Sequence, residues 1–263
     1  MTALTTSMAA AARMLGEGLV DLLLPHVCPA CGRAGISAGG LCDACNLELL
    51  SLIALPYCPR CGSSLGVNIP ARKDGCSECP TPLPRFARAI RLGPYAGPLR
   101  SAVRDLKYHR RNTMLTVTAR LLAHAIAGKC QEQRFDIIVP IPAHWRRRLS
   151  RGADHAAAIS RAIAGLLSLP VEQELLRIRH TPPQTHLSRT RRLANVRNAF
   201  AARNPRSLAG ANVLLVDDVT TTGATANEAA RTLLKAGASH VTLAVIAKSE
   251  PPTAYAEHFT DPR

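Results

Sequence analysis

The sequence predicts an α/β protein in which a twisted parallel sheet with flanking helices follows a small cysteine-rich, metal-binding unit. Eight of the nine cysteines lie in the first third of the chain, whereas Ile- and Val-rich runs alternate with stretches of helical period after it. The chain has 263 residues, which is enough for about two domains of roughly 100–200 residues each.

The charge of the chain divides at the same place. Residues 1–83 hold five basic and six acidic side chains, whereas residues 84–263 hold 28 basic and 12 acidic ones. The first part therefore has a net charge of −1 and the second part a net charge of +16, which together give the +15 of the whole chain. Such a basic domain is expected to meet anions, which include nucleic acid, membrane phosphates and phosphorylated metabolites.

The eight clustered cysteines form four Cys-x-x-Cys pairs. Each pair can chelate one metal ion with two thiolates, and the regular repetition favours zinc over a disulfide framework. Taken in sequence order, the pairs predict two zinc sites, with the ligands Cys28, Cys31, Cys42 and Cys45 in one and Cys58, Cys61, Cys76 and Cys79 in the other. The spacing also permits an interleaved cross-brace, in which the first pair joins the third.

Metal-binding thiols require a reducing compartment, and the N-terminal residues agree with one. They lack a basic segment, and Glu17 and Asp21 interrupt their apolar stretch, so a secretion signal is not expected. Residues 8–24 predict a packing helix, with a membrane-surface helix as the alternative. We expect a cytoplasmic protein without a membrane span, because no apolar run reaches the ~20 residues that cross a bilayer.

Beyond a stiff linker with Pro80, Pro82 and Pro84, strand and helix periods alternate. Strands are expected at 87–95, 135–140, 212–216 and 241–247, and helices at 99–108, 113–128, 153–169 and 223–236. The expected units are an N-terminal helix (1–25), a cysteine-rich unit (26–83), an α/β domain (84–252) and a tail (253–263). Ligands are expected at the carboxyl ends of the strands.

The most informative segment is residues 213–225, which read VLLVDDVTTTGAT. Asp217 and Asp218 follow a buried strand, where carboxylates can accept hydrogen bonds from hydroxyls or help hold a cation. The threonines, Gly223 and the start of a helix suit a phosphate monoester. Ribose 5-phosphate combines vicinal hydroxyls with such a phosphate. An N-capping threonine cluster or an acidic pocket of the response-regulator kind explains fewer of these residues.

Two further basic segments are candidates for anion binding. The strand at 135–140 is followed by four guanidinium groups, which could bind pyrophosphate or line a nucleic-acid surface, at Arg146, Arg147, Arg148 and Arg151. Residues 177–200 are polar and basic with little periodicity. They could fold over a ligand as a lid, or form a surface loop that binds nucleic acid.

Residues 213–225 resemble the PRPP-binding motif of type I phosphoribosyltransferases, without a gap. The resemblance implies that Asp217 and Asp218 form the catalytic pair that holds the ribose hydroxyls. It also implies that residues 221–225, the threonine loop, hold the 5-phosphate. The full predicted PRPP-binding set, which adds residues assigned from the sequence itself, is Val216, Asp217, Asp218, Thr220, Thr221, Thr222, Gly223, Ala224 and Thr225, together with Lys107, Arg148 and Arg151.

The order of the motifs along the chain resembles that of the ComF family of competence-associated proteins. Cysteine knuckles precede a Leu106-Lys107-Tyr108 step, an Arg-Gly after the basic loop, a Thr-x-x-Gln-x-x-Leu run and the PRPP motif. The resemblance implies a type I phosphoribosyltransferase-like parallel sheet behind a double zinc ribbon. One departure is that the family usually continues its Arg-Gly with Phe-Asn-Gln, whereas this chain has Ala153, Asp154 and His155.

Two functions follow as hypotheses. In one, the protein binds magnesium with PRPP and transfers the phosphoribosyl group to an unknown acceptor, in a role linked by resemblance to uptake of single-stranded DNA. In the other, it is a non-catalytic competence factor that senses PRPP or a nucleotide, or binds single-stranded DNA. The low aromatic content of 3% weighs against strand binding by base stacking.

Overall fold

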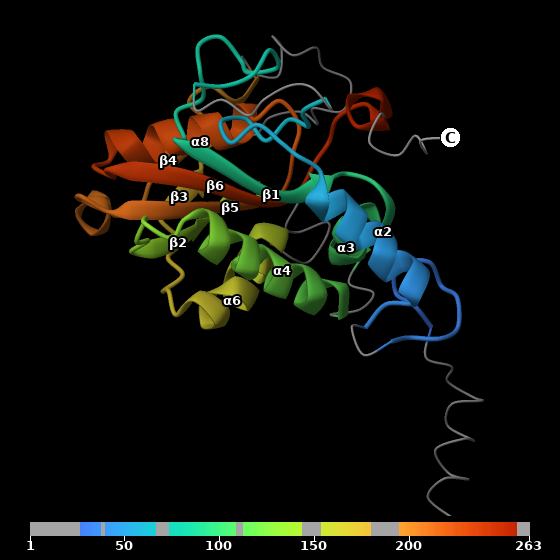
Figure 1. The fold of residues 1–263 in the computed structure, drawn as a ribbon. Coiled ribbons are helices and arrows are strands. Elements are labelled where there is room, and N and C mark those ends of the chain that lie inside the picture. The colour runs from blue at the N-terminus through green and yellow to red at the C-terminus, as the bar shows by residue number, and fades with distance from the viewer. Residues whose placement is uncertain are drawn as a thin grey trace, which may run out of the picture.

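A four-stranded parallel sheet forms the centre of the molecule (Figure 1). The computed structural model describes residues 27–37, 40–66, 74–108, 113–143, 154–179 and 195–256. In spatial order the strands are β1 (Arg88–Pro94), β6 (His240–Lys248), β5 (Asn212–Thr220) and β2 (Ile137–Pro140), and each neighbouring pair is parallel. The predicted helix at 8–24 lies outside the described residues, as does the tail beyond residue 256.

Helices cover both faces of this sheet. Helices α4 (Thr113–Lys129) and α6 (His155–Leu167) lie on one face, and α8 (Ala224–Lys235) lies on the other (Figure 1). Successive side chains of a strand point to opposite faces, so Leu214 and Val216 enter the first core while Val213 and Leu215 enter the second. Burial on both faces explains why the central strand is continuously apolar.

The predicted α/β order is confirmed, with differences that include the length of β5 and an unpredicted helix. Strand β5 continues past Val216 to Thr220, because β6 extends beside it and pairs Lys248 with Thr220. Helix α2 (Asp43–Ala54) was not predicted. Its buried face is hidden in the sequence because Leu47 and Leu50, which are 66% and 49% exposed, interrupt the helical period.

The remaining elements lie at the edges of the sheet. Helix α3 (Gly97–Tyr108) follows β1, and a short antiparallel pair, β3 (Leu175–Arg177) and β4 (Phe200–Ala202), packs near α8. Single-turn 3-10 helices occur at Pro205–Leu208 and Pro252–Ala254. Among the helices in the described ranges, none is both long and apolar enough to cross a membrane.

The cysteine-rich unit packs directly on the sheet domain. Its second Cys-Pro-x-Cys-Gly knuckle, residues 58–62, extends the free edge of β1, because Ala89 N–H donates to the Pro59 carbonyl at 2.8 Å. The Arg60 guanidinium donates to the carbonyls of Pro84 and Phe86, both at 2.9 Å. The knuckle therefore covers a strand edge that would otherwise be available for pairing with another chain.

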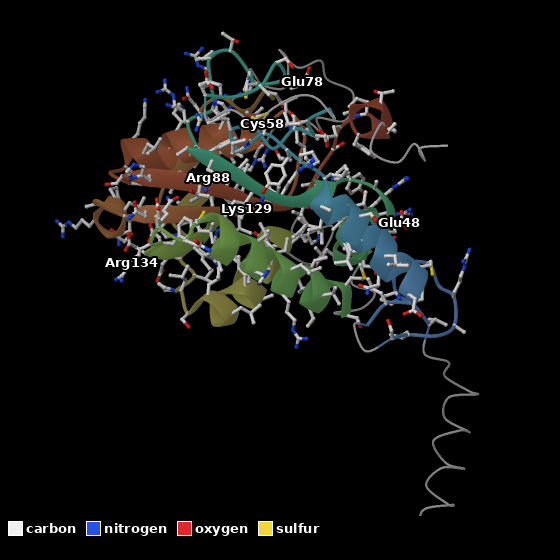
Figure 2. All side chains as sticks on the ribbon, viewed as in Figure 1. Glu48, Cys58, Glu78, Arg88, Lys129 and Arg134 are labelled. Carbon is white, nitrogen blue, oxygen red and sulfur yellow. The ribbon has the colours of Figure 1, made fainter. Side chains whose placement is uncertain are left out.

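A buried ion pair joins the knuckle, β1 and the segment after β6. The Arg91 side chain is 1% exposed and its Nη1 lies 2.6 Å from Glu250 Oε1. Its Nη2 donates to Ser64 Oγ at 2.7 Å, and Ser64 N–H donates to Glu250 Oε2 at 3.0 Å. The guanidinium also lies 5.1 Å from the centre of the Tyr57 ring. The ammonium of Lys129, which is labelled in Figure 2, lies 4.7 Å from that centre.

Replacing Arg91 with Met should lower the free energy of unfolding by about 3–5 kcal/mol, because it leaves the Glu250 carboxylate buried without its cation. Urea unfolding measures this loss. The double variant Arg91→Met/Glu250→Gln should lose less than the single variant, since the uncompensated charge is gone. As a control, Arg134→Met removes an exposed arginine (Figure 2) and should change stability by at most ~0.5 kcal/mol. Equal losses in the single and double variants would contradict the ion-pair explanation.

Candidate functional site

The end of β5, the following loop and the start of α8 form the centre of the candidate site. Asp217 and Asp218 are half-buried in the last part of β5, and Gly223 is the N-cap of α8 with a φ of 76°. Glycine adopts this left-handed conformation without strain. Gly223 has no side chain with which to cap α8, and Ala224 N–H makes only a long hydrogen bond, 3.4 Å, to Thr222 Oγ1. The positive end of α8 therefore lies at the threonine loop, as an anion-binding terminus would.

The two acids are held by the backbone around them. Asp218 N–H donates to Asp217 Oδ1 at 2.9 Å, and Val219 N–H donates to Asp218 Oδ1 at 2.7 Å. Burial raises the pKa of Asp217 well above its ordinary value, and the negative charge of Asp218 raises it further, while Arg177 opposes both. The pair therefore favours a proton, a cation or hydroxyl donors beside it.

His155 connects the start of α6 to this acidic pair. Its Nδ1 lies 3.7 Å from Asp218 Oδ2, and its buried Nε2 has no hydrogen-bond partner in the part of the chain that the structure describes. Asp154 is the N-cap of α6 and accepts a hydrogen bond from Ala157 N–H at 3.3 Å. Two of the positions that depart from the family pattern thus have structural roles, one as a helix cap and one facing the acids. The third, Ala153, lies outside the described residues.

Lys248 supports the threonine loop from β6. Its ammonium donates to the Thr221 carbonyl at 2.7 Å, and the residue is 7% exposed. Neither the role of Lys248 nor the contact of His155 with Asp218 was predicted, because both contacts join residues far apart in the chain. The available signal for Lys248 was a lysine at the end of a strand that is otherwise almost entirely apolar.

The structure describes only part of the predicted basic residues. Arg148 and Arg151 lie outside the described residues, and Lys107 lies in α3 without a described side chain. The segment at 177–200, expected as a lid or a nucleic-acid surface, begins and ends in the β3–β4 pair. The Arg177 guanidinium lies 5.5 Å from the centre of the Phe200 ring there. The structure thus brings together the acids and the threonine loop, and leaves the pyrophosphate contacts as predictions.

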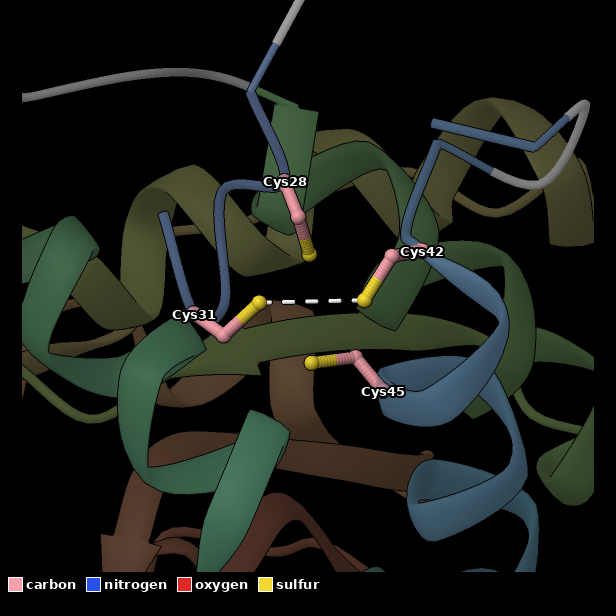
Figure 3. A group of neighbouring side chains, drawn as sticks. All are labelled: Cys28, Cys31, Cys42 and Cys45. Atoms are coloured by element: carbon pink, nitrogen blue, oxygen red, sulfur yellow. Dashed lines mark hydrogen bonds between the residues drawn. The ribbon is translucent and has the colours of Figure 1, made fainter. Parts of the chain in front are cut away.

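The eight clustered cysteines form two groups in sequence order. Within each group all four sulfur atoms lie within 4.8 Å of one another, and Figure 3 shows those of the first group turned toward a common centre. The groups are Cys28, Cys31, Cys42 and Cys45, and Cys58, Cys61, Cys76 and Cys79. The sequential arrangement is therefore confirmed, and the interleaved one is not formed.

The sulfur spacing fits zinc. The distances from Cys31 to Cys42, from Cys58 to Cys79 and from Cys61 to Cys76 are each 3.7 Å between Sγ atoms. A Zn–S bond of about 2.3 Å in a tetrahedron places sulfurs about 3.75 Å apart, whereas a disulfide requires about 2.05 Å. The two groups of four cysteines are therefore consistent with two structural zinc ions.

The thiols of the first group differ in acidity. Burial opposes ionisation of Cys28, but the backbone N–H groups of Cys42, Cys31 and Ala30 lower its pKa to about 6. Burial and the neighbouring thiols instead raise the pKa of Cys45. Four sulfurs at this spacing cannot all be thiolates without a cation, since like charges repel at close range. A divalent ion that binds sulfur removes this conflict.

Comparison with known proteins agrees with the combination of two four-cysteine groups and a parallel-sheet domain. Residues 19–80 match the Double zinc ribbon domain, and residues 114–259 match the Phosphoribosyl transferase domain. The fold and the site thus define a phosphoribosyltransferase-domain protein with a double zinc ribbon in front of it. The chain belongs to the ComF family of competence and DNA utilization proteins.

Two relatives illustrate the family. The DNA utilization protein YhgH of Salmonella typhi is 31% identical over 226 residues, which cover 84% of this chain and 96% of the relative. Competence protein F of Haemophilus influenzae is 30% identical over 215 residues, which cover 80% of this chain and 91% of the relative. A crystal structure of adenine phosphoribosyltransferase aligns with 57% of this chain and 78% of its own, at 15% identity and a TM-score of 0.38.

Purified protein should contain two zinc ions per chain, measured by plasma mass spectrometry after dialysis against a weak chelator. Cys42→Ser and Cys79→Ser should each reduce the content toward one ion, because each removes one thiolate from a different group of four cysteines. Cys130→Ser is the matched control, since Cys130 lies outside both groups. Zinc loss in the Cys130 variant, or full retention in the other two, would contradict the assignment.

The ligand-free protein should lose stability as pH rises above the ordinary range for Asp. The folded state raises the pKa of Asp217. The Asp217 carboxyl therefore contributes its full stabilisation below the pKa of the unfolded state, and this stabilisation is lost as pH rises through the pKa of the folded state. Asp217→Asn removes this loss. The Tm of this variant should exceed that of the wild type by about 2–4 °C at pH 8, because a gain of ~1 kcal/mol in unfolding free energy raises Tm by that amount in a chain of this size. The gain should vanish near pH 4, and Glu172→Gln, at an exposed carboxylate, should show no such trend.

Proposed function

We propose that residues 217–225 bind the ribose 5-phosphate part of PRPP, and that the protein transfers the phosphoribosyl group to an acceptor with release of pyrophosphate. The observation that carries this proposal is the placement of two half-buried acids on the same strand that leads to the N-terminus of α8, where Gly223 is the N-cap. Hydroxyl acceptors and a phosphate-binding helix end therefore follow each other in the order in which ribose 5-phosphate presents its groups. Membership of a family with a phosphoribosyltransferase domain supports the same ligand.

In this mechanism the protein binds and orients PRPP, and no side chain acts as nucleophile. Asp217 and Asp218 accept hydrogen bonds from the ribose hydroxyls and stabilise the positive charge that develops on the ribose. The 5-phosphate is held by the helix terminus, with the hydroxyls of Thr221, Thr222 and Thr225 as donors. The bond between C1 and the pyrophosphate oxygen breaks with its electron pair on pyrophosphate, and an acceptor nitrogen bonds to C1 and loses a proton.

The leaving pyrophosphate carries negative charge that must be balanced. We assign Lys107, Arg148 and Arg151 to this task, since guanidinium groups bind such oxygens in a forked geometry. The acidic pair fits a site with magnesium nearby, because magnesium prefers oxygen ligands and keeps substrate phosphates in its shell. Magnesium would supply charge neutralisation of the pyrophosphate when bound together with PRPP.

The names of the relatives support a setting in DNA metabolism for the proposed site. They are described as DNA utilization and competence proteins, and we extend that setting to this chain. The net charge of +16 on residues 84–263 supports contact with a polyanion. With 3% aromatic residues, such contact is expected to be electrostatic and strongly dependent on salt.

Isothermal titration should show PRPP binding that requires magnesium, and Asp217→Ala/Asp218→Ala should weaken it at least tenfold. An acceptor panel of nucleobases and amines on the same preparation then tests transfer, through release of pyrophosphate. Glu172→Gln, which removes an exposed carboxylate elsewhere, should leave both unchanged. Unaltered affinity in the double variant would refute the site. Binding without pyrophosphate release from any acceptor would favour a PRPP sensor over an enzyme.

A further inference from the structure

Lys248 lies between the second cysteine group and the threonine loop. Its ammonium donates to the Thr221 carbonyl at 2.7 Å, and its stem packs beside the knuckle, where a Cβ added to Gly62 would lie 3.7 Å from Lys248 Cδ. The backbone of Lys248 is fixed as well. Ser249 N–H donates to the Thr220 carbonyl at 2.8 Å, and Tyr95 N–H donates to the Lys248 carbonyl at 2.7 Å.

The linker between the knuckle and β1 approaches the same loop. Phe86 is 1% exposed, and a Cβ added to Gly223 would lie 3.8 Å from its ring. Arg85 N–H donates to Asn227 Oδ1 on the first turns of α8 at 2.7 Å. Arg60, inside the second cysteine knuckle, holds the Phe86 carbonyl. The knuckle therefore reaches the loop by two routes, one through Lys248 and one through the linker.

The positive charge of Lys248 lies between two sites that would each hold negative charge. Four thiolates around one divalent zinc ion carry a net charge of −2, and two of the four cysteines, Cys58 and Cys61, are at most 7% exposed. A phosphate monoester on the threonine loop would be a second dianion. A buried lysine between them offsets the repulsion that two anionic groups would otherwise exert at low dielectric.

We propose that Lys248 is a positioning residue that couples zinc in the second cysteine group to ribose 5-phosphate binding at the threonine loop. The proposal rests on the proposed function, and it assigns the second zinc site a role beyond folding of its own ribbon. The first cysteine group has different neighbours. Ser101 of α3 donates to the Ala30 carbonyl at 3.0 Å, and a Cβ added to Gly40 would lie 3.5 Å from Thr113 and Val117 of α4. Zinc in the first group should therefore leave the loop unchanged.

Lys248→Met tests the lysine directly, with Lys235→Met as its matched control. Lys235 is exposed in the last turn of the same helix that begins at the loop, so both variants lose one positive charge. Lys248→Met should retain two zinc ions, bind ribose 5-phosphate at least tenfold more weakly and lose amide-exchange protection at residues 220–225. Its affinity for pyrophosphate, assigned to a different segment, should stay within twofold. Equal weakening for both ligands would indicate general damage and overturn the positioning role.

The cysteine variants test the link to zinc. Cys79→Ser should lower both loop protection and ribose 5-phosphate affinity, whereas Cys42→Ser, which also loses one ion, should change neither. Equal effects of the two cysteine variants, or of the two lysine variants, would overturn the coupling. If Cys79→Ser does not fold, the lysine pair decides the question. If the wild-type protein binds no ribose 5-phosphate, the proposed function fails, while amide exchange in the Lys248 and Lys235 variants still tests whether Lys248 holds the loop.

Discussion

The pairing of β5 with β6 is the constraint on which the rest of the site depends. The two strands run side by side from Asn212 and His240 to Thr220 and Lys248. Their shared register places the acids of β5 and the lysine of β6 at the same end of the sheet, so the strand that carries the acids also meets the residue that fixes the loop. A shift by one residue would exchange the two faces of β5 and bury Asp217 and Asp218 differently. Such a shift would also force both cores to repack, because Leu214 and Leu215 are fully buried on opposite faces.

The cysteine-rich unit completes the sheet domain. Strand β1 is an edge strand, and its outer side is met by the Pro59 carbonyl and by the Arg60 contacts of the second knuckle. The Arg91 and Glu250 pair then closes the same region. A small ribbon has little core of its own: the buried cluster at the second cysteine group consists of Cys58, Cys61 and Leu65. Buried residues of the first ribbon, such as Leu41 and Leu49, belong to a core shared with the sheet. Metal ligation and docking on β1 therefore stabilise each other.

Patterns local in the sequence predicted most of the fold, and contacts distant in the sequence account for what was missed. The apolar run at 212–216 and the helical period at 223–236 were sufficient to locate β5 and α8, and the Cys-x-x-Cys spacing gave both cysteine groups. The extension of β5 to Thr220 could not be seen, because it depends on a partner strand 28 residues further along. The β3–β4 pair was missed for the same reason, since each strand has only three residues and its partner lies in a separate part of the chain. His155 and Lys248 come close to Asp218 and Thr221 only when the chain is folded, and no spacing in the sequence relates these residues.

The acidic pair carries an electrostatic cost that the rest of β5 does not. Two adjacent carboxyls share a half-buried position, and burial together with their mutual repulsion raises the pKa of Asp217. A neutral residue would relieve this cost, and the acids follow the fully buried apolar positions of β5, which end at Val216. His155 faces only one oxygen of Asp218, at a distance too long for a strong hydrogen bond. Under the proposed function, a ribose would bring two hydroxyl donors to these acids without adding a further buried charge.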